Sequence, residues 1–201
     1  MKLVLGSDLH GNLPDVPPCD ILVLAGDILP ETEQEVFIEQ QLRPWLEKIP
    51  ARNVVSTWGN HDHKPFRNSR LGINLRWHLL VDDSVSINGL KFYGSPWCLP
   101  IGRWAWQAPE YLLEHIYSLI PNDTDILISH SPPYGMCYRV VSGENVGSIE
   151  LARLVHGLTG LKLLVCGHIH ESRGQRGKVM NVSCLDEKYQ LRENLWTVIQ
   201  L

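Results

Sequence analysis

Short apolar runs alternate with amphipathic segments along this chain. Five continuous apolar runs have the length of strands buried on both faces of a sheet. They lie at residues 2–5, 21–25, 53–57, 125–129 and 161–166. Helical spacing of apolar side chains marks residues 32–49, 109–120 and 148–158, and Pro44 predicts a break or kink in the first of these helices. The alternation of strands and helices predicts an α/β fold.

An antiparallel portion is predicted to join this sheet. Segments 84–87 and 90–93 flank Asn88 and Gly89, the dipeptide favoured in type I′ hairpin turns. Segments 178–182 and 196–201 are expected to be closing strands around a polar turn at 186–194. No repeat, low-complexity tract or flexible linker divides the sequence, so residues 1–201 are predicted to form a single domain.

Composition and charge narrow the classes of protein. The chain is 44% hydrophobic and 20% charged, as in an average globular protein, and its net charge of −4 gives no general attraction to nucleic acid or membranes. Asp8 and His10 interrupt the first apolar run too early for a signal peptide. Five cysteines without a CxxC pair argue against disulfides or a structural zinc cluster, and they suit a reducing compartment. A cytoplasmic location is expected.

Polar residues suited to metal binding follow all five buried strands. In order, the motifs are Asp8-Leu9-His10, Gly26-Asp27, Gly59-Asn60-His61-Asp62, His130 and Gly167-His168-Ile169-His170. Each motif alone is common in ordinary turns. Ligand sites in α/β sheets form at the carboxyl ends of strands, so this succession predicts one shared site.

The ordered pattern DxH, GD, GNHD, H and GHxH resembles the calcineurin-like metallophosphoesterase superfamily from Asp8 to His170. The resemblance implies a sandwich of two mixed β-sheets flanked by helices, with two divalent cations at the strand ends. By motif position, Asp8, His10, Asp27 and His170 would bind one cation. Asp27, Asn60, His130 and His168 would bind the other, with Asp27 bridging the pair.

The residue types agree with the chemistry that the resemblance implies. A mixed shell of carboxylate, imidazole and amide suits Mn²⁺, Fe or Zn²⁺ better than Mg²⁺, and Mn²⁺ is favoured here. A hydroxide held between two cations would attack the phosphorus, so no serine or cysteine nucleophile is required. His61 would face the phosphate as general acid or charge stabiliser. Asp62 would orient His61 by a hydrogen bond, and its alternative role is to cap the turn.

Further segments resemble one branch of the superfamily. Residues 93–97 (YGSPW), 130–133 and 146–171 are similar to the brain-type metallophosphoesterase-domain proteins and their bacterial relatives. The arginine that protein phosphatases carry after the GD motif is absent, because Ile28 follows Asp27. The resemblance implies a phosphodiesterase acting on small nucleotide-like or aryl phosphate esters. The alternatives are a nuclease of the same superfamily, which the net charge disfavours, and a non-catalytic nucleotide-binding or scaffold protein.

The stretch at residues 97–106 (WCLPIGRWAW) is rich in aromatic side chains. Trp97 is predicted to stack on a base or aryl group, with Arg103 toward the phosphate. Asn60 is also expected to contact substrate. The alternative for this stretch is a hydrophobic lid or a contact between two copies of the chain in a homodimer.

Overall fold

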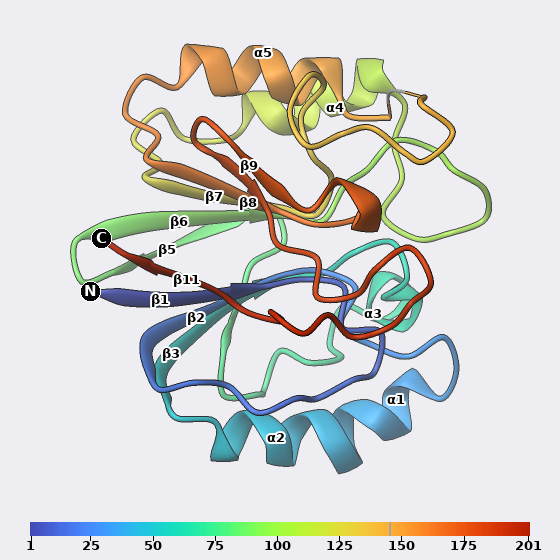
Figure 1. Ribbon diagram of the computed structural model, residues 1–201, viewed down its shortest axis with the longest axis vertical. Helices are drawn as coiled ribbons and strands as arrows, with labels where there is room; N and C mark the ends of the chain where they lie inside the picture. Colours follow the sequence, from blue (N-terminus) through green and yellow to red (C-terminus); the bar gives the residue numbers. More distant parts are fainter. Residues whose placement is uncertain (145) are drawn as a thin grey trace.

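Two β-sheets lie face to face in the computed structural model, which describes residues 1–144 and 146–201, and helices cover the outer face of each sheet (Figure 1). This arrangement confirms the predicted α/β sandwich of two mixed sheets. No helix of the described chain combines the length and the apolar composition needed to cross a membrane.

The five-stranded sheet contains the first three predicted strands. Its order is β11 (Thr197–Gln200), β1 (Lys2–Gly6), β2 (Cys19–Ala25), β3 (Ala51–Thr57) and β4 (His78–Leu79). All neighbours are parallel except β11, which runs antiparallel to β1. Side chains alternate along β1, so that Val4 packs toward the helices while Leu3 and Leu5 pack toward the other sheet. Burial on both faces explains the continuous apolar runs.

The six-stranded sheet contains the predicted hairpin. Its order is β5 (Asp83–Ile87), β6 (Leu90–Ser95), β7 (Ile126–Ser129), β8 (Leu163–Cys166), β10 (Val179–Asn181) and β9 (Gly174–Arg176). The edge strands β5 and β9 are antiparallel to their neighbours, and the inner pairs are parallel. Asn88 and Gly89 both have positive φ, at 52° and 80°, which confirms the type I′ turn. The two predicted closing strands form, but β10 and β11 belong to different sheets.

The helical segment that contains Pro44 adapts to the missing proline N–H. It consists of α1 (Gln34–Phe37), a π-helical turn η1 (Ile38–Leu42) and α2 (Arg43–Lys48). The N–H of Arg43 donates to the carbonyl of Ile38, five residues back, directly before Pro44. The widened turn accommodates a residue that cannot donate, so the predicted irregularity is a π-bulge.

The other helices complete the outer layers and the loops. Helices α4 (Glu110–Ser118) and α5 (Ile149–Gly157) cover the six-stranded sheet, opposite α1 and α2 (Figure 1). Ser148 caps α5 by accepting a hydrogen bond from the N–H of Leu151. The short α3 (His63–Arg67) follows the GNHD motif, and the 3₁₀ turn η2 (His170–Ser172) begins at the last residue of the GHxH motif.

The carboxyl ends of the two sheets meet at one edge of the sandwich. A parallel bridge pairs Ser7, after β1, with Ser183, after β10. Within each sheet, backbone hydrogen bonds join the loops that follow the strands: Asp8 N–H donates to Gly26, and Gly167 N–H donates to His130. Five loops that are distant in sequence therefore surround one location.

Candidate metal centre

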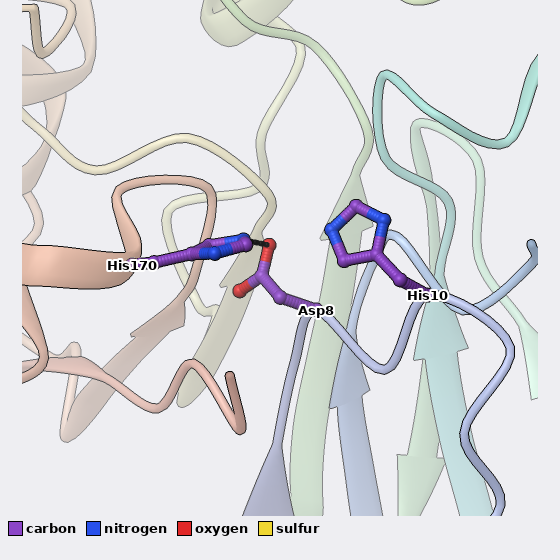
Figure 2. Close-up of side chains that lie close together, drawn as sticks. All are labelled: Asp8, His10 and His170. Atoms are coloured by element: carbon purple, nitrogen blue, oxygen red, sulfur yellow. Dashed lines mark ion pairs between the residues drawn. The ribbon is translucent and has the colours of Figure 1, made fainter. Parts of the chain in front are cut away.

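Six of the seven side chains predicted as ligands, together with His61, form three groups at this edge, and Asn60 lies beside His130. Three overlapping groups each place one ligand atom per residue within 4.8 Å of the others in the group. The groups are Asp8, His10 and His170; His10, Asp27 and His61; and Asp27, His130 and His168. Figure 2 shows Asp8 between the imidazoles of His10 and His170.

The Asp27 carboxylate lies between two sets of candidate ligands. Its Oδ2 is 3.7 Å from Nε2 of His10 on one side and 3.3 Å from Nε2 of His130 on the other. Asn60 Oδ1 is 2.9 Å from the same His130 nitrogen, while Asp8 Oδ1 is 3.5 Å from Nε2 of His170. One carboxylate therefore faces both sets of candidate ligands.

Backbone carbonyls fix the orientation of two imidazoles. Nδ1 of His130 is 2.9 Å from the carbonyl of Ala25, and Nδ1 of His170 is 3.0 Å from the carbonyl of Asp186. Because a carbonyl only accepts, Nδ1 carries the hydrogen, and Nε2 of each ring is directed at the carboxylates. Such a hydrogen bond holds a histidine in the orientation that a metal ligand needs.

Buried nitrogens without partners fit a metal site. Both ring nitrogens of His10 are buried and have no hydrogen-bond partner among the described residues. Buried polar atoms in proteins normally have a hydrogen-bond partner or a ligand, so the unpartnered nitrogens of His10 fit a metal-binding role. The carboxylate, imidazole and amide donors around it match the set that Mn²⁺, Fe and Zn²⁺ accept.

The charges at this edge favour a cation. Burial opposes ionisation of Asp8 and Asp27, yet His170 and His130 hold the pKa of their respective carboxyl partners below the ordinary value. Burial opposes protonation of His130, but the charge of Asp27 raises the pKa of His130 to about 9. Burial and the charge of His130 lower the pKa of His168 to about 3, which leaves that ring neutral. A divalent cation supplies the positive charge that protons otherwise provide.

Four of the candidate ligands have a backbone conformation that non-glycine residues rarely adopt. The φ angles are 55° for Asp8, 43° for His10, 52° for Asp27 and 66° for His168. Left-handed conformations of this kind concentrate at functional sites, where the surrounding structure holds them in place. Here they turn the chain sharply at the strand ends.

The glycines of the GD and GNHD motifs are required by close packing. A Cβ on Gly26 would lie 2.6 Å from Nδ1 of His130, and Gly26 has a φ of 90°. A Cβ on Gly59 would lie 2.5 Å from the backbone nitrogen of Asp27 and 2.7 Å from Cε1 of His130. Any side chain at these positions would displace candidate ligands.

Two buried residues that the sequence did not indicate support the site. Ser183 Oγ donates to Asp8 Oδ2 at 2.6 Å, and Asp8 also accepts from the N–H of His168. Gln34 donates to the carbonyl of His61 at 2.7 Å and to that of Pro30 at 2.8 Å. Serine and glutamine occur widely in loops and helices, so only the fold identifies these contacts.

Replacing Ser183 by alanine is expected to weaken Mn²⁺ binding about 10–100-fold, the usual cost of losing a group that orients a ligand. The reason is that Asp8 would lose its hydroxyl donor and one constraint on its orientation. Calorimetric titration with Mn²⁺ would measure the change. Ser56→Ala is the matched control, because Ser56 is equally buried and, within the part of the chain that the structure describes, its hydroxyl bonds only to the carbonyl of Thr57. Equal affinities for the two variants would contradict the role of Ser183.

The contacts of Asp62 differ from the predicted hydrogen bond to His61. Its carboxylate accepts from the backbone N–H groups of Gly59 at 2.8 Å, Leu29 at 2.9 Å and Ile28 at 3.1 Å. Burial and the charge of Asp27 raise the pKa of Asp62 to about 8, and the N–H donors of Leu29 and Gly59 oppose that shift. Asp62 caps the turn that begins at Gly59, which was the alternative, and it also joins the loops after β2 and β3. No hydrogen bond from its carboxylate to His61 occurs in the described chain.

The residues predicted to contact substrate lie in different surroundings. Asn60 is in the cluster, whereas the indole N–H of Trp97 donates to Asp82 at 2.6 Å and its ring packs against Phe66 and Trp106. Trp97 is thus part of an aromatic cluster with Phe66 and Trp106, and its contact with substrate stays a prediction. Arg103 is exposed on that loop.

Two other aromatic residues border the candidate ligands. Trp104 stacks on the imidazole of His61, and the ring of Tyr189 lies edge-on to His10 and His170, with centroids 5.0 and 4.9 Å away. Both aromatic side chains are partly exposed, at 40% and 54%. The aromatic stretch at 97–106 pointed to the Trp104 region, and no pattern in the sequence indicated Tyr189.

Two packed β-sheets carry carboxylate and imidazole groups at the edge where their strand ends meet. This arrangement is that of a metal-binding α/β protein. The sequence profile of the calcineurin-like phosphoesterase family matches residues 1–172, and the chain therefore belongs to this metal-dependent family.

Several relatives share this domain. Metallophosphoesterase domain-containing protein 1 of Homo sapiens is 30% identical over 204 residues, covering 86% of this chain and 61% of the relative. A UPF0046 protein of Caenorhabditis elegans is 28% identical over 192 residues, covering 87% of this chain and 65% of the relative. The probable rhamnogalacturonate lyase C of Emericella nidulans is 29% identical over 87% of this chain, which is 18% of that protein. The chain spans less than two thirds of each of these relatives.

Proposed function

We propose that this chain is a phosphodiesterase that holds two divalent cations and hydrolyses small nucleotide-like or aryl phosphate diesters. The observation that carries the proposal is the position of Asp27, whose carboxylate faces His10 on one side and His130 on the other. A carboxylate shared in this way offsets the repulsion between two cations. Membership of the calcineurin-like phosphoesterase family supports the reaction class.

Each chain segment has a defined part in this proposal. One cation would be held by Asp8, His10, Asp27 and His170, and the other by Asp27, Asn60, His130 and His168. Mn²⁺ is the preferred ion because the donor set mixes oxygen and nitrogen. When bound, the cations would make a water more acidic and stabilise negative charge on the phosphoryl oxygens.

His61 is proposed as the group that faces the phosphate. Its backbone N–H donates to Asp27 Oδ1 at 2.7 Å, which places it beside the cluster. Its ring Nδ1 is buried and has no hydrogen-bond partner among the described residues. In this proposal the imidazole donates a proton to the leaving oxygen or stabilises developing charge. Burial lowers the pKa of His61 and so opposes the protonated form that either task needs.

The proposal is tested with protein stripped of metal by a chelator and then supplied with Mn²⁺ and bis-p-nitrophenyl phosphate. Release of p-nitrophenol is expected only after Mn²⁺ is added, with two ions per chain by elemental analysis. Absence of metal-dependent turnover would overturn the phosphodiesterase assignment. Protein that neither retains metal nor gains thermal stability from Mn²⁺ would instead indicate a scaffold.

A further inference from the structure

Hydrogen bonds fix the backbone of His61, but none of those within residues 1–144 and 146–201 involves its ring. The backbone N–H donates to Asp27, and the carbonyl accepts from Gln34. The neighbouring carboxylate of Asp62 accepts from three backbone N–H groups, and no hydrogen bond among the described residues joins it to the imidazole. Another contact must therefore determine the orientation of this ring.

Two aromatic contacts define the position of the imidazole. The ring of Trp104 stacks on it with a centroid distance of 3.9 Å and an interplanar angle of 28°. The ring of His10 meets it edge-on at 4.6 Å. The indole covers one face of His61 and resists rotation about the bond that carries the ring.

The loop that carries Trp104 is attached to the loop that carries His61. The N–H of Ala105 donates to the carbonyl of Asn60 at 3.0 Å, and the indole N–H of Trp106 donates to the carbonyl of Asp62 at 3.1 Å. These bonds come from the two residues after Trp104 and reach the two residues on either side of His61. Because the two loops are joined at both points, the stacked pair is held in register.

We propose that Trp104 is a positioning residue that orients the His61 imidazole for reaction by stacking on it. The proposal rests on the proposed function for the role of His61 in turnover. In this proposal the indole of Trp104 orients His61, the role that was predicted for the Asp62 carboxylate. Trp104 acts through His61, so its contribution to turnover depends on the presence of that imidazole.

A double-mutant cycle in the Mn²⁺-loaded enzyme tests this dependence. Trp104→Leu is expected to lower kcat about tenfold, while KM changes less than about twofold. The loss in kcat is a fraction of the full contribution of a positioned acid. Trp104→Phe, which keeps a flat ring, should recover most of that loss. In a His61→Ala background, Trp104→Leu should lower kcat little further. Equal losses in both backgrounds, or a rise in KM alone, would overturn the proposal.

The matched control is Ile101→Ala, an exposed apolar side chain on the same loop. It should leave kcat, KM and thermal stability unchanged. If Ile101→Ala lowers kcat as much as Trp104→Leu does, the effect belongs to the loop as a whole and the positioning role is overturned.

A spectroscopic readout does not depend on turnover. In protein with ¹³C-labelled histidine, the Cε1–H signal of His61 is assigned by its loss in His61→Ala. Trp104→Leu should move this signal downfield by removing the indole ring current, and Ile101→Ala should not. An unmoved signal would overturn the stacking itself. A moved signal in protein without hydrolytic activity would instead overturn only the proposed function.

Discussion

Asp27→Asn is expected to abolish metal-dependent turnover, with a loss of at least about 10³-fold. The substitution removes the carboxylate charge that faces both His10 and His130. Without it, two cations would repel each other with less compensation, and elemental analysis should find fewer than two ions per chain. Turnover of bis-p-nitrophenyl phosphate, measured with saturating Mn²⁺, checks the prediction.

Asparagine is the informative replacement because it keeps an oxygen that can accept from the N–H of His61. Circular dichroism before and after heating should show that the variant is folded. Asp20→Asn is the matched control, since Asp20 lies near the start of β2, the strand that Asp27 follows, and it accepts from the backbone N–H of Lys2. If the Asp27→Asn variant kept two ions per chain and turned over substrate as fast as the unmodified protein, the shared-carboxylate arrangement would be wrong.

His61→Ala is expected to lower kcat roughly 10²–10⁴-fold, the range for loss of a general acid, while both cations stay bound. Alanine preserves the backbone N–H that bonds to Asp27, so the ligand cluster should keep its shape. Metal content by elemental analysis and steady-state kinetics, measured on the same preparation, separate the two effects.

Loss of a cation in His61→Ala would have a different meaning. His61, His10 and Asp27 also lie close enough to hold an ion by themselves. Loss of one cation in His61→Ala would therefore identify His61 as a ligand and contradict its proposed role toward the phosphate. His115→Ala is the control for removal of an imidazole, because His115 is exposed on the outer helix α4.

The parts of the fold that are buried on both faces could be predicted from the sequence. Parallel strands covered by helices on one side and a sheet on the other need apolar residues at every position, and such runs are visible without alignment. Polar residues directly after each run then indicate the functional edge. Asp8 and His130 are more than 100 residues apart, yet both follow strands whose carboxyl ends must share that edge.

Other features depend on how closely the loops approach each other. The partners of Asp62 are backbone groups, and backbone donors are identical at every residue type except proline. Trp104 and Ser183 contact His61 and Asp8 from loops that have no periodicity. The short strands β4 and β9 are partly or fully exposed, so no apolar run marks them.

The positions of the candidate ligands have a consequence for folding. Asp8, His10, Asp27 and Asn60 follow strands of one sheet, whereas His130, His168 and His170 follow strands of the other. A cation pair held among them would cross-link the two halves of the sandwich much as a covalent tie does. Occupancy and unfolding would then be linked equilibria, and the protein would draw part of its resistance to heat from the concentration of free metal around it.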